Sequence, residues 1–167
     1  MTTHGIWTTD DKKELKLLRK KVASFDFNKY SKKDLESLLK KMRVAMKKAA
    51  GIGLSANQFG LDANFFIAEL SGKFYAVFNP KITKASGASV MEEGCLSVPG
   101  FFGEVSRSEK VILEGLDKNQ KPIKIKAWGL LARIFQHEVD HLNGALFIDK
   151  AKEVKKYDEG TKIGNKK

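Results

Sequence analysis

Two histidines four residues apart constrain the fold of this chain more than any other feature. They lie in the stretch QHEVDH at residues 136–141, as His137 and His141, with Glu138 directly after the first. Residues i and i+4 share one face of an α-helix, so a helix lets both imidazoles bind one cation. Glu138 is then placed to take a proton from a water on that cation. Apolar residues at helical spacing precede the motif, and we predict a helix over residues 128–143.

A catalytic metal site needs a third protein ligand, and the sequence offers three candidates. One protease pattern continues to a third histidine, but Phe147 stands at that position. Another pattern uses a later glutamate, and Glu159 lies 18 residues beyond His141, in a charged tail that is poorly suited to rigid ligation. The single cysteine, Cys95, cannot form an internal disulfide, and its thiolate is a strong ligand. We favour Cys95, because the histidine pair needs a partner.

The remaining pattern predicts an α+β fold, with largely antiparallel β-sheets packed around this C-terminal helix. Two N-terminal helices are expected, a short basic one over residues 11–23 and a longer one over residues 32–50. Ser31 and Asp34 resemble a capping box at the start of the second helix. Aromatic and β-branched residues then predict two hairpins, formed by strands at 64–70 with 73–79, joined by Ser71-Gly72, and at 111–116 with 123–127.

Length and charge indicate a single soluble domain over residues 1–167. The net charge of +11 comes mostly from lysine and would attract polyanions such as ribosomal RNA, although solvated helix faces explain it more simply. A lone cysteine fits a reducing compartment, and we see no secretory signal and no membrane-spanning apolar run. We expect a cytoplasmic protein of bacterial, organellar or viral origin. Its Lys-rich tail, 151–167, is expected to fray as a short helix or to be disordered.

Three motifs in a fixed order resemble those of the peptide deformylases. The family pattern GxGLAAxQ appears as GIGLSANQ at residues 51–58, EGCLS appears at residues 93–97, and QHExDHLxG appears as QHEVDHLNG at residues 136–144. Ser55 stands where the family has alanine, a small-for-small change that we expect to matter little. The resemblance spans roughly residues 10–150. It implies an enzyme that hydrolyses the formyl group from formylmethionine at the N-terminus of newly synthesised proteins.

The resemblance implies a metal-dependent mechanism. Cys95, His137 and His141 would hold one divalent metal ion, and Glu138 would act as general base and then as general acid. Two imidazoles and one thiolate suit iron(II), zinc, nickel or cobalt. The family implies Fe²⁺ as the native ion, with Zn²⁺, Ni²⁺ or Co²⁺ as substitutes.

Further residues are assigned by the same resemblance. Gln58 and the backbone N–H of Leu96 would stabilise the oxyanion of the tetrahedral intermediate. The stretch 52–53 would pair with the substrate backbone as an added strand. The remaining assignments are Ile52, Gly53 and Gly94 as substrate contacts, Leu130 and Ile134 as pocket walls that could equally be core, and Glu93 with Arg107 as a supporting ion pair.

Two other functions remain open from the residues alone. A zinc endopeptidase could use the same histidine helix, but it would leave the motif around Cys95 unexplained. A ribosome- or RNA-binding protein with a structural metal would use the basic surface, but a closed site has no need of Glu138. The partners expected for a deformylase are formylmethionyl nascent peptides and, through the Lys-rich tail, a transient ribosome contact. We expect a monomer with no membrane partner and no specific DNA.

Overall fold

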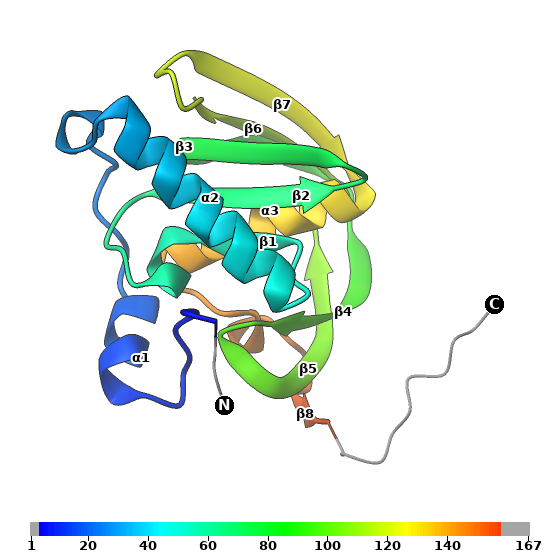
Figure 1. Cartoon of the computed structure of the whole chain (residues 1–167). Helices are drawn as coiled ribbons and strands as arrows, with labels where there is room; N and C mark the ends of the chain where they lie inside the picture. Colours follow the sequence, from blue (N-terminus) through cyan, green and yellow to red (C-terminus); the bar gives the residue numbers. More distant parts are fainter. Residues whose placement is uncertain (1–3, 158–167) are drawn as a thin grey trace.

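Two antiparallel sheets and three α-helices form the part of the chain that the computed structural model describes, residues 4–157 (Figure 1). The α-helices are α1 (Lys12–Leu18), α2 (Lys32–Lys48) and α3 (Gly129–Leu142), and the 3-10 turns are η1 (Phe27–Lys29), η2 (Ala56–Phe59) and η3 (Phe147–Asp149). The strands are β1 (Gly53–Ser55), β2 (Phe65–Leu70), β3 (Lys73–Ser86), β4 (Ser89–Cys95), β5 (Val98–Arg107), β6 (Lys110–Leu116), β7 (Pro122–Trp128) and β8 (Lys155–Lys156).

The larger sheet has the strand order β1-β2-β3-β6-β7 and separates two helices. Alternate residues of β2 point to opposite faces, as strand geometry requires. Phe65 and Ile67 pack with the buried side of α2, whereas Phe66 and Ala68 pack with α3 residues such as Phe135. Figure 1 accordingly shows α2 in front of the sheet and α3 behind it. The two-histidine motif at residues 136–141 therefore lies on a helix that packs against the large sheet.

The smaller sheet has the order β4-β5-β8 and brings the cysteine to this helix. Strand β4 ends at Cys95, and the pairing with β5 shifts register between Gly94 and Cys95. A third core cluster, which includes Val98, Val105 and Phe147, packs beneath this sheet. Strands β4 and β5 were not predicted from the sequence, because glycines and charged residues interrupt the apolar alternation there.

The predicted α+β class, the 32–50 helix, both hairpins and the 128–143 helix are confirmed. Most limits change little, but the strand predicted over 73–79 continues to Ser86. The Ser31 side chain accepts the Asp34 N–H at 3.1 Å and begins α2. The predicted 11–23 helix is too long, because α1 ends at Leu18. The next residues leave the helix to reach the end of α3, where the Val22 N–H donates to the Leu142 carbonyl at 3.0 Å.

The Lys-rich tail differs from the prediction where the structure describes it. Residues 151–157 contain β8, which pairs with β5 opposite Phe101 and Phe102, instead of a short helix. Residues 158–167, and with them the candidate ligand Glu159, lie outside the described residues. Within residues 4–157, no helix is both long and apolar enough to cross a membrane.

Candidate metal centre and substrate pocket

Three side chains that the sequence singled out meet at one point. His137 and His141 project from the same side of α3, with their Nε2 atoms 3.2 Å apart. The Sγ atom of Cys95 lies 3.2 Å from Nε2 of His141, although 46 residues separate the two. All three ligand atoms lie within 4.8 Å of one another. Phe147 stands where one protease pattern has its third histidine. It is buried in the third core cluster and has no metal-binding atom.

The two histidines of this cluster differ in how their surroundings treat a positive charge. Burial disfavours the charged form of His137, but hydrogen bonds to Cys95 and Glu93 outweigh burial and raise the pKa of His137 to about 10. Burial, and then the positive charge on His137, lower the pKa of His141 well below its ordinary value. One thiol and two imidazoles are the ligands that borderline divalent cations prefer. The residues therefore fit one such cation held by Cys95, His137 and His141.

The sulfur of Cys95 is fixed by two donors. The Ser97 N–H donates to Sγ at 3.4 Å, and Nε2 of Gln58 donates to it at 3.6 Å. Gln58 is itself held, because Nε2 also donates to Oγ of Ser97 at 3.0 Å and its Oε1 accepts the Ser55 N–H at 2.9 Å. The amide NH₂ of Gln58 is thereby directed at Cys95 and Ser97, beside the pocket that Gln58 lines. Leu96 follows Cys95 and packs against Gly51, where a Cβ atom would come within 2.6 Å of the leucine side chain.

Glu93 holds the first histidine through a buried charge network. Nδ1 of His137 lies 3.0 Å from Oε2 of Glu93, which orients the imidazole. Arg107 contacts the same carboxylate through Nε at 2.5 Å and Nη2 at 3.0 Å, so the expected pair is a buried bidentate ion pair in the structure. Burial alone would raise the pKa of Glu93, but His137 and Arg107 outweigh it and hold that pKa far below its ordinary value. Glu93 thus carries a fixed negative charge beside the cluster of Cys95, His137 and His141.

A second arginine in this network was missed by the sequence analysis. Nη1 of Arg133 donates to Oε1 of Glu93 at 2.7 Å and to the Val105 carbonyl at 2.9 Å. Arg133 lies four residues before His137, and this helical spacing places both on the same face of α3. The spacing could therefore have predicted the contact from the sequence. Arg107 also reaches Asp140 at 2.8 Å, which ties the network to α3 a second time.

Glu138 is buried beside the cluster, with 3% of its surface exposed. Burial raises the pKa of its carboxyl group. The Oγ atom of Ser55 lies 2.6 Å from Oε2 of Glu138 and 3.0 Å from its backbone carbonyl oxygen. Gly53 faces the same carboxyl group so closely that a Cβ atom there would lie 2.9 Å from Cδ of Glu138. Strand β1 therefore supports the glutamate from two positions.

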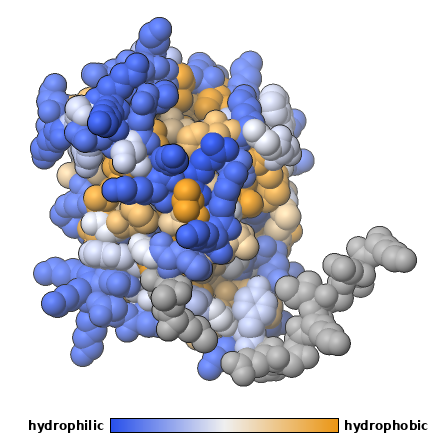
Figure 2. Space-filling model, in the orientation of Figure 1, coloured by the Kyte–Doolittle hydropathy of each residue, from blue (hydrophilic) through white to orange (hydrophobic). Residues whose placement is uncertain are grey.

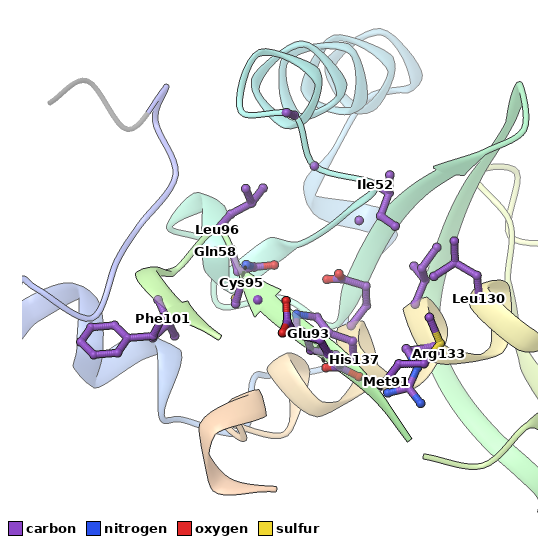
Figure 3. Close-up of a pocket in the computed structure, with 18 of the residues that line it drawn as sticks. Ile52, Gln58, Met91, Glu93, Cys95, Leu96, Phe101, Leu130, Arg133 and His137 are labelled. Carbon is purple, nitrogen blue, oxygen red and sulfur yellow. Dashed lines mark hydrogen bonds and ion pairs between the residues drawn. The ribbon is translucent and has the colours of Figure 1, made fainter. Parts of the chain in front are cut away.

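The cluster opens into a pocket of about 450 Å³ (Figure 3). The five residues expected to contact substrate all line it: Ile52, Gly53, Gly94, Leu130 and Ile134. Leu130 and Ile134 reach it from α3, and Ile52 reaches it from the edge of the large sheet. Further apolar lining residues were not predicted from the sequence. Among them are Met91, Phe101 and Tyr157, which lie on β4, on β5 and after β8, strands that the sequence did not predict.

Comparisons with known proteins agree on one family. A family model described as polypeptide deformylase matches residues 5–157. The peptide deformylase of Pelotomaculum thermopropionicum is 43% identical over 119 residues, which cover 71% of this chain and 77% of that protein. The peptide deformylase of Halothermothrix orenii is 47% identical over 116 residues, covering 68% of this chain and 75% of that protein.

Solved structures give the same result. The crystal structure of peptide deformylase from Thermotoga maritima superposes with a TM-score of 0.80 at 33% identity, covering 89% of this chain and 97% of that one. A peptide deformylase from Synechococcus elongatus in complex with actinonin gives a TM-score of 0.79 at 35% identity, covering 89% of this chain and 78% of that one.

Proposed function

The chain belongs to the polypeptide deformylase family, and we propose that Cys95, His137 and His141 hold the metal ion for its hydrolytic reaction. That reaction removes the formyl group from the formylmethionine of newly synthesised proteins and releases formate. The observation that carries the assignment is the approach of Cys95 Sγ to 3.2 Å from Nε2 of His141, with all three ligand atoms within 4.8 Å of one another. We further propose that residues 1–167 act as one catalytic domain.

The proposed native ion is Fe²⁺, with Zn²⁺, Ni²⁺ or Co²⁺ as substitutes. A divalent cation at this site supplies Lewis acidity, which lowers the pKa of a water molecule toward neutrality. Glu138 is the proposed group that takes the proton from the water and returns it to the leaving amine nitrogen. Its burial supports this role, because burial raises the pKa of a carboxyl group toward the range useful in acid–base catalysis.

Gln58 and the backbone N–H of Leu96 are the proposed donors to the oxyanion of the tetrahedral intermediate. Gln58 carries no charge, and its NH₂ group lies beside Cys95, where the reacting carbonyl would be bound. Both residues line the pocket. Donors of this kind are each worth about 3–4 kcal/mol of transition-state stabilisation.

The proposed substrate contacts use the free edge of the large sheet. Strand β1 pairs with β2 on one side and is terminal in the strand order, so a peptide can add to its other side at residues 52–53. Gly94 lies across the pocket at the end of β4. Leu130 and Ile134 are the proposed apolar walls around the methionine side chain.

Replacing Gly53 with alanine is expected to lower kcat by about tenfold or more, because the new methyl group would displace the Glu138 carboxylate. Bound metal should stay unchanged, since no ligand moves. Steady-state kinetics on a formylmethionyl peptide, with metal analysis of the same sample, provide the measurement. A rise in KM with an unchanged kcat would show instead that Gly53 serves only the approach of the substrate.

We also propose a cytoplasmic monomer that contacts ribosomes transiently through its basic surface. Hydrophilic side chains cover much of the face drawn in Figure 2, and the net charge of +11 favours association with polyanions. No specific DNA and no membrane partner are proposed. Ribosome co-sedimentation with and without residues 151–167 tests this contact. An unchanged bound fraction would count against a contact made through the tail.

Formate release tests the proposed function directly. The protein is purified without oxygen and loaded with Fe²⁺ or Ni²⁺, then given a short formylmethionyl peptide or its acetylated counterpart. We expect formate from the formyl peptide and no cleavage of the acetyl peptide. A folded, metal-loaded protein that releases no formate would refute the proposal, and cleavage of casein would then favour the endopeptidase.

A further inference from the structure

We propose that Ser55 is a positioning residue for Glu138, whose hydroxyl holds Oε2 and leaves Oε1 as the oxygen that exchanges the proton. This inference rests on the proposed function, in which Glu138 is the base and then the acid. A proton would pass from water to Oε1 as the water oxygen bonds to the formyl carbon. The same proton would then pass from Oε1 to the amine nitrogen as the carbon–nitrogen bond breaks.

The contact between the two side chains is short and shielded from solvent. Oγ of Ser55 lies 2.6 Å from Oε2 of Glu138, within the range of charge-assisted O–H···O⁻ hydrogen bonds. Ser55 is fully buried, and Glu138 is almost so. Water therefore competes weakly for this hydrogen bond, which fixes the rotation of the carboxylate about its terminal bond.

The two carboxylate oxygens have different surroundings. Oε2 accepts the Ser55 hydroxyl, whereas no hydrogen bond to Oε1 is found among residues 4–157. Oε1 lies against Gly53, which has no side chain to cover that oxygen. Gly53 and Glu138 both line the pocket. The hydroxyl thus leaves Oε1, on the side of Gly53, as the oxygen available for proton exchange. Alanine, which stands at this place in the family motif, would leave both oxygens without this restraint. The contact therefore revises the expectation from the sequence that this small-for-small change matters little in this chain.

Ser55 also has a structural role that must be separated from positioning. Its side chain takes part in the cap of η2, where Gln58 is the reciprocal partner. However, the hydrogen bond that holds Gln58 comes from the Ser55 backbone N–H at 2.9 Å, and replacement of the side chain leaves it in place. Loss of the hydroxyl should therefore change the orientation of Glu138 more than that of Gln58.

The test compares Ser55→Ala and Ser55→Thr with the unchanged chain, all loaded with Ni²⁺. We expect Ser55→Ala to lower kcat for a formylmethionyl peptide by about ten- to fiftyfold, with KM changed by less than about twofold, as for loss of one hydrogen bond to a reacting group. Ser55→Thr keeps the hydroxyl and should recover most of kcat. Metal content and thermal unfolding are measured on every variant, and Ser86→Ala, an exposed serine on β3, is the matched control.

Two outcomes would overturn the inference. An unchanged kcat in Ser55→Ala would show that Glu138 needs no partner at Oε2. Loss of metal, or a raised KM together with a lower melting temperature, would assign Ser55 to the fold alone. If Ser55→Thr does not fold, Ser55→Ala still tests the inference, because a positioning role lowers kcat and leaves KM nearly unchanged. Failure of the proposed function is distinct, because the unchanged, metal-loaded chain would then release no formate at all.

Discussion

Glu138→Gln is expected to lower kcat for formate release by about 10²–10⁴-fold, the usual contribution of a positioned acid–base group. Glutamine has nearly the same shape, and its side-chain oxygen can still accept the Ser55 hydroxyl. It cannot take a proton from water, so the fall should appear in kcat and little in KM. Formate release over a range of peptide concentrations measures both constants.

The control for this substitution is Glu104→Gln, which removes an exposed carboxylate on β5 outside the pocket. It should leave kcat and metal content unchanged. Metal analysis of Glu138→Gln is also needed, because an empty site would imitate the loss of the base. Full activity in metal-loaded Glu138→Gln would remove Glu138 from its proposed role and with it the premise for Ser55.

Cys95→Ala is expected to lose both bound metal and activity. The substitution removes one of three ligands, and a loss of metal affinity above about 100-fold follows, since loss of an outer-shell partner alone costs 10–100-fold. The two histidines remain on α3, so the helix should persist in circular dichroism. Metal content after dialysis against a weak chelator provides the measurement.

A matched comparison between two of the three histidines sharpens this test. His137→Ala should lose metal as Cys95→Ala does, whereas His4→Ala should keep it, because His4 is exposed and outside the ligand cluster. Metal retained at full occupancy in Cys95→Ala would contradict the proposed ligand set. That result would point to a different third ligand, as the endopeptidase interpretation requires.

Local patterns were sufficient for the elements whose faces are strongly apolar. Helix α3 and the two hairpins show clear periods of 3.6 and 2 residues, and the structure confirms them. Helical periodicity predicted too long a helix for α1. Val22 is apolar because it packs against the end of α3 and not because the helix continues. Periodicity also failed in β4 and β5, whose glycines fit close backbone contacts. A Cβ atom at Gly103 would clash with the backbone carbonyl oxygen of Glu153.

The sequence by itself determined the chemistry of the site: two histidines on one helical face, a glutamate between them and a single cysteine. Those identities are properties of residue type and short spacing. Only the tertiary structure decided that Cys95 reaches the histidines, that Arg133 joins Arg107 on Glu93, and that Ser55 contacts Glu138 across 83 residues. These contacts follow from how the two sheets pair and pack against α3, and local periodicity carries no information about such long-range pairing.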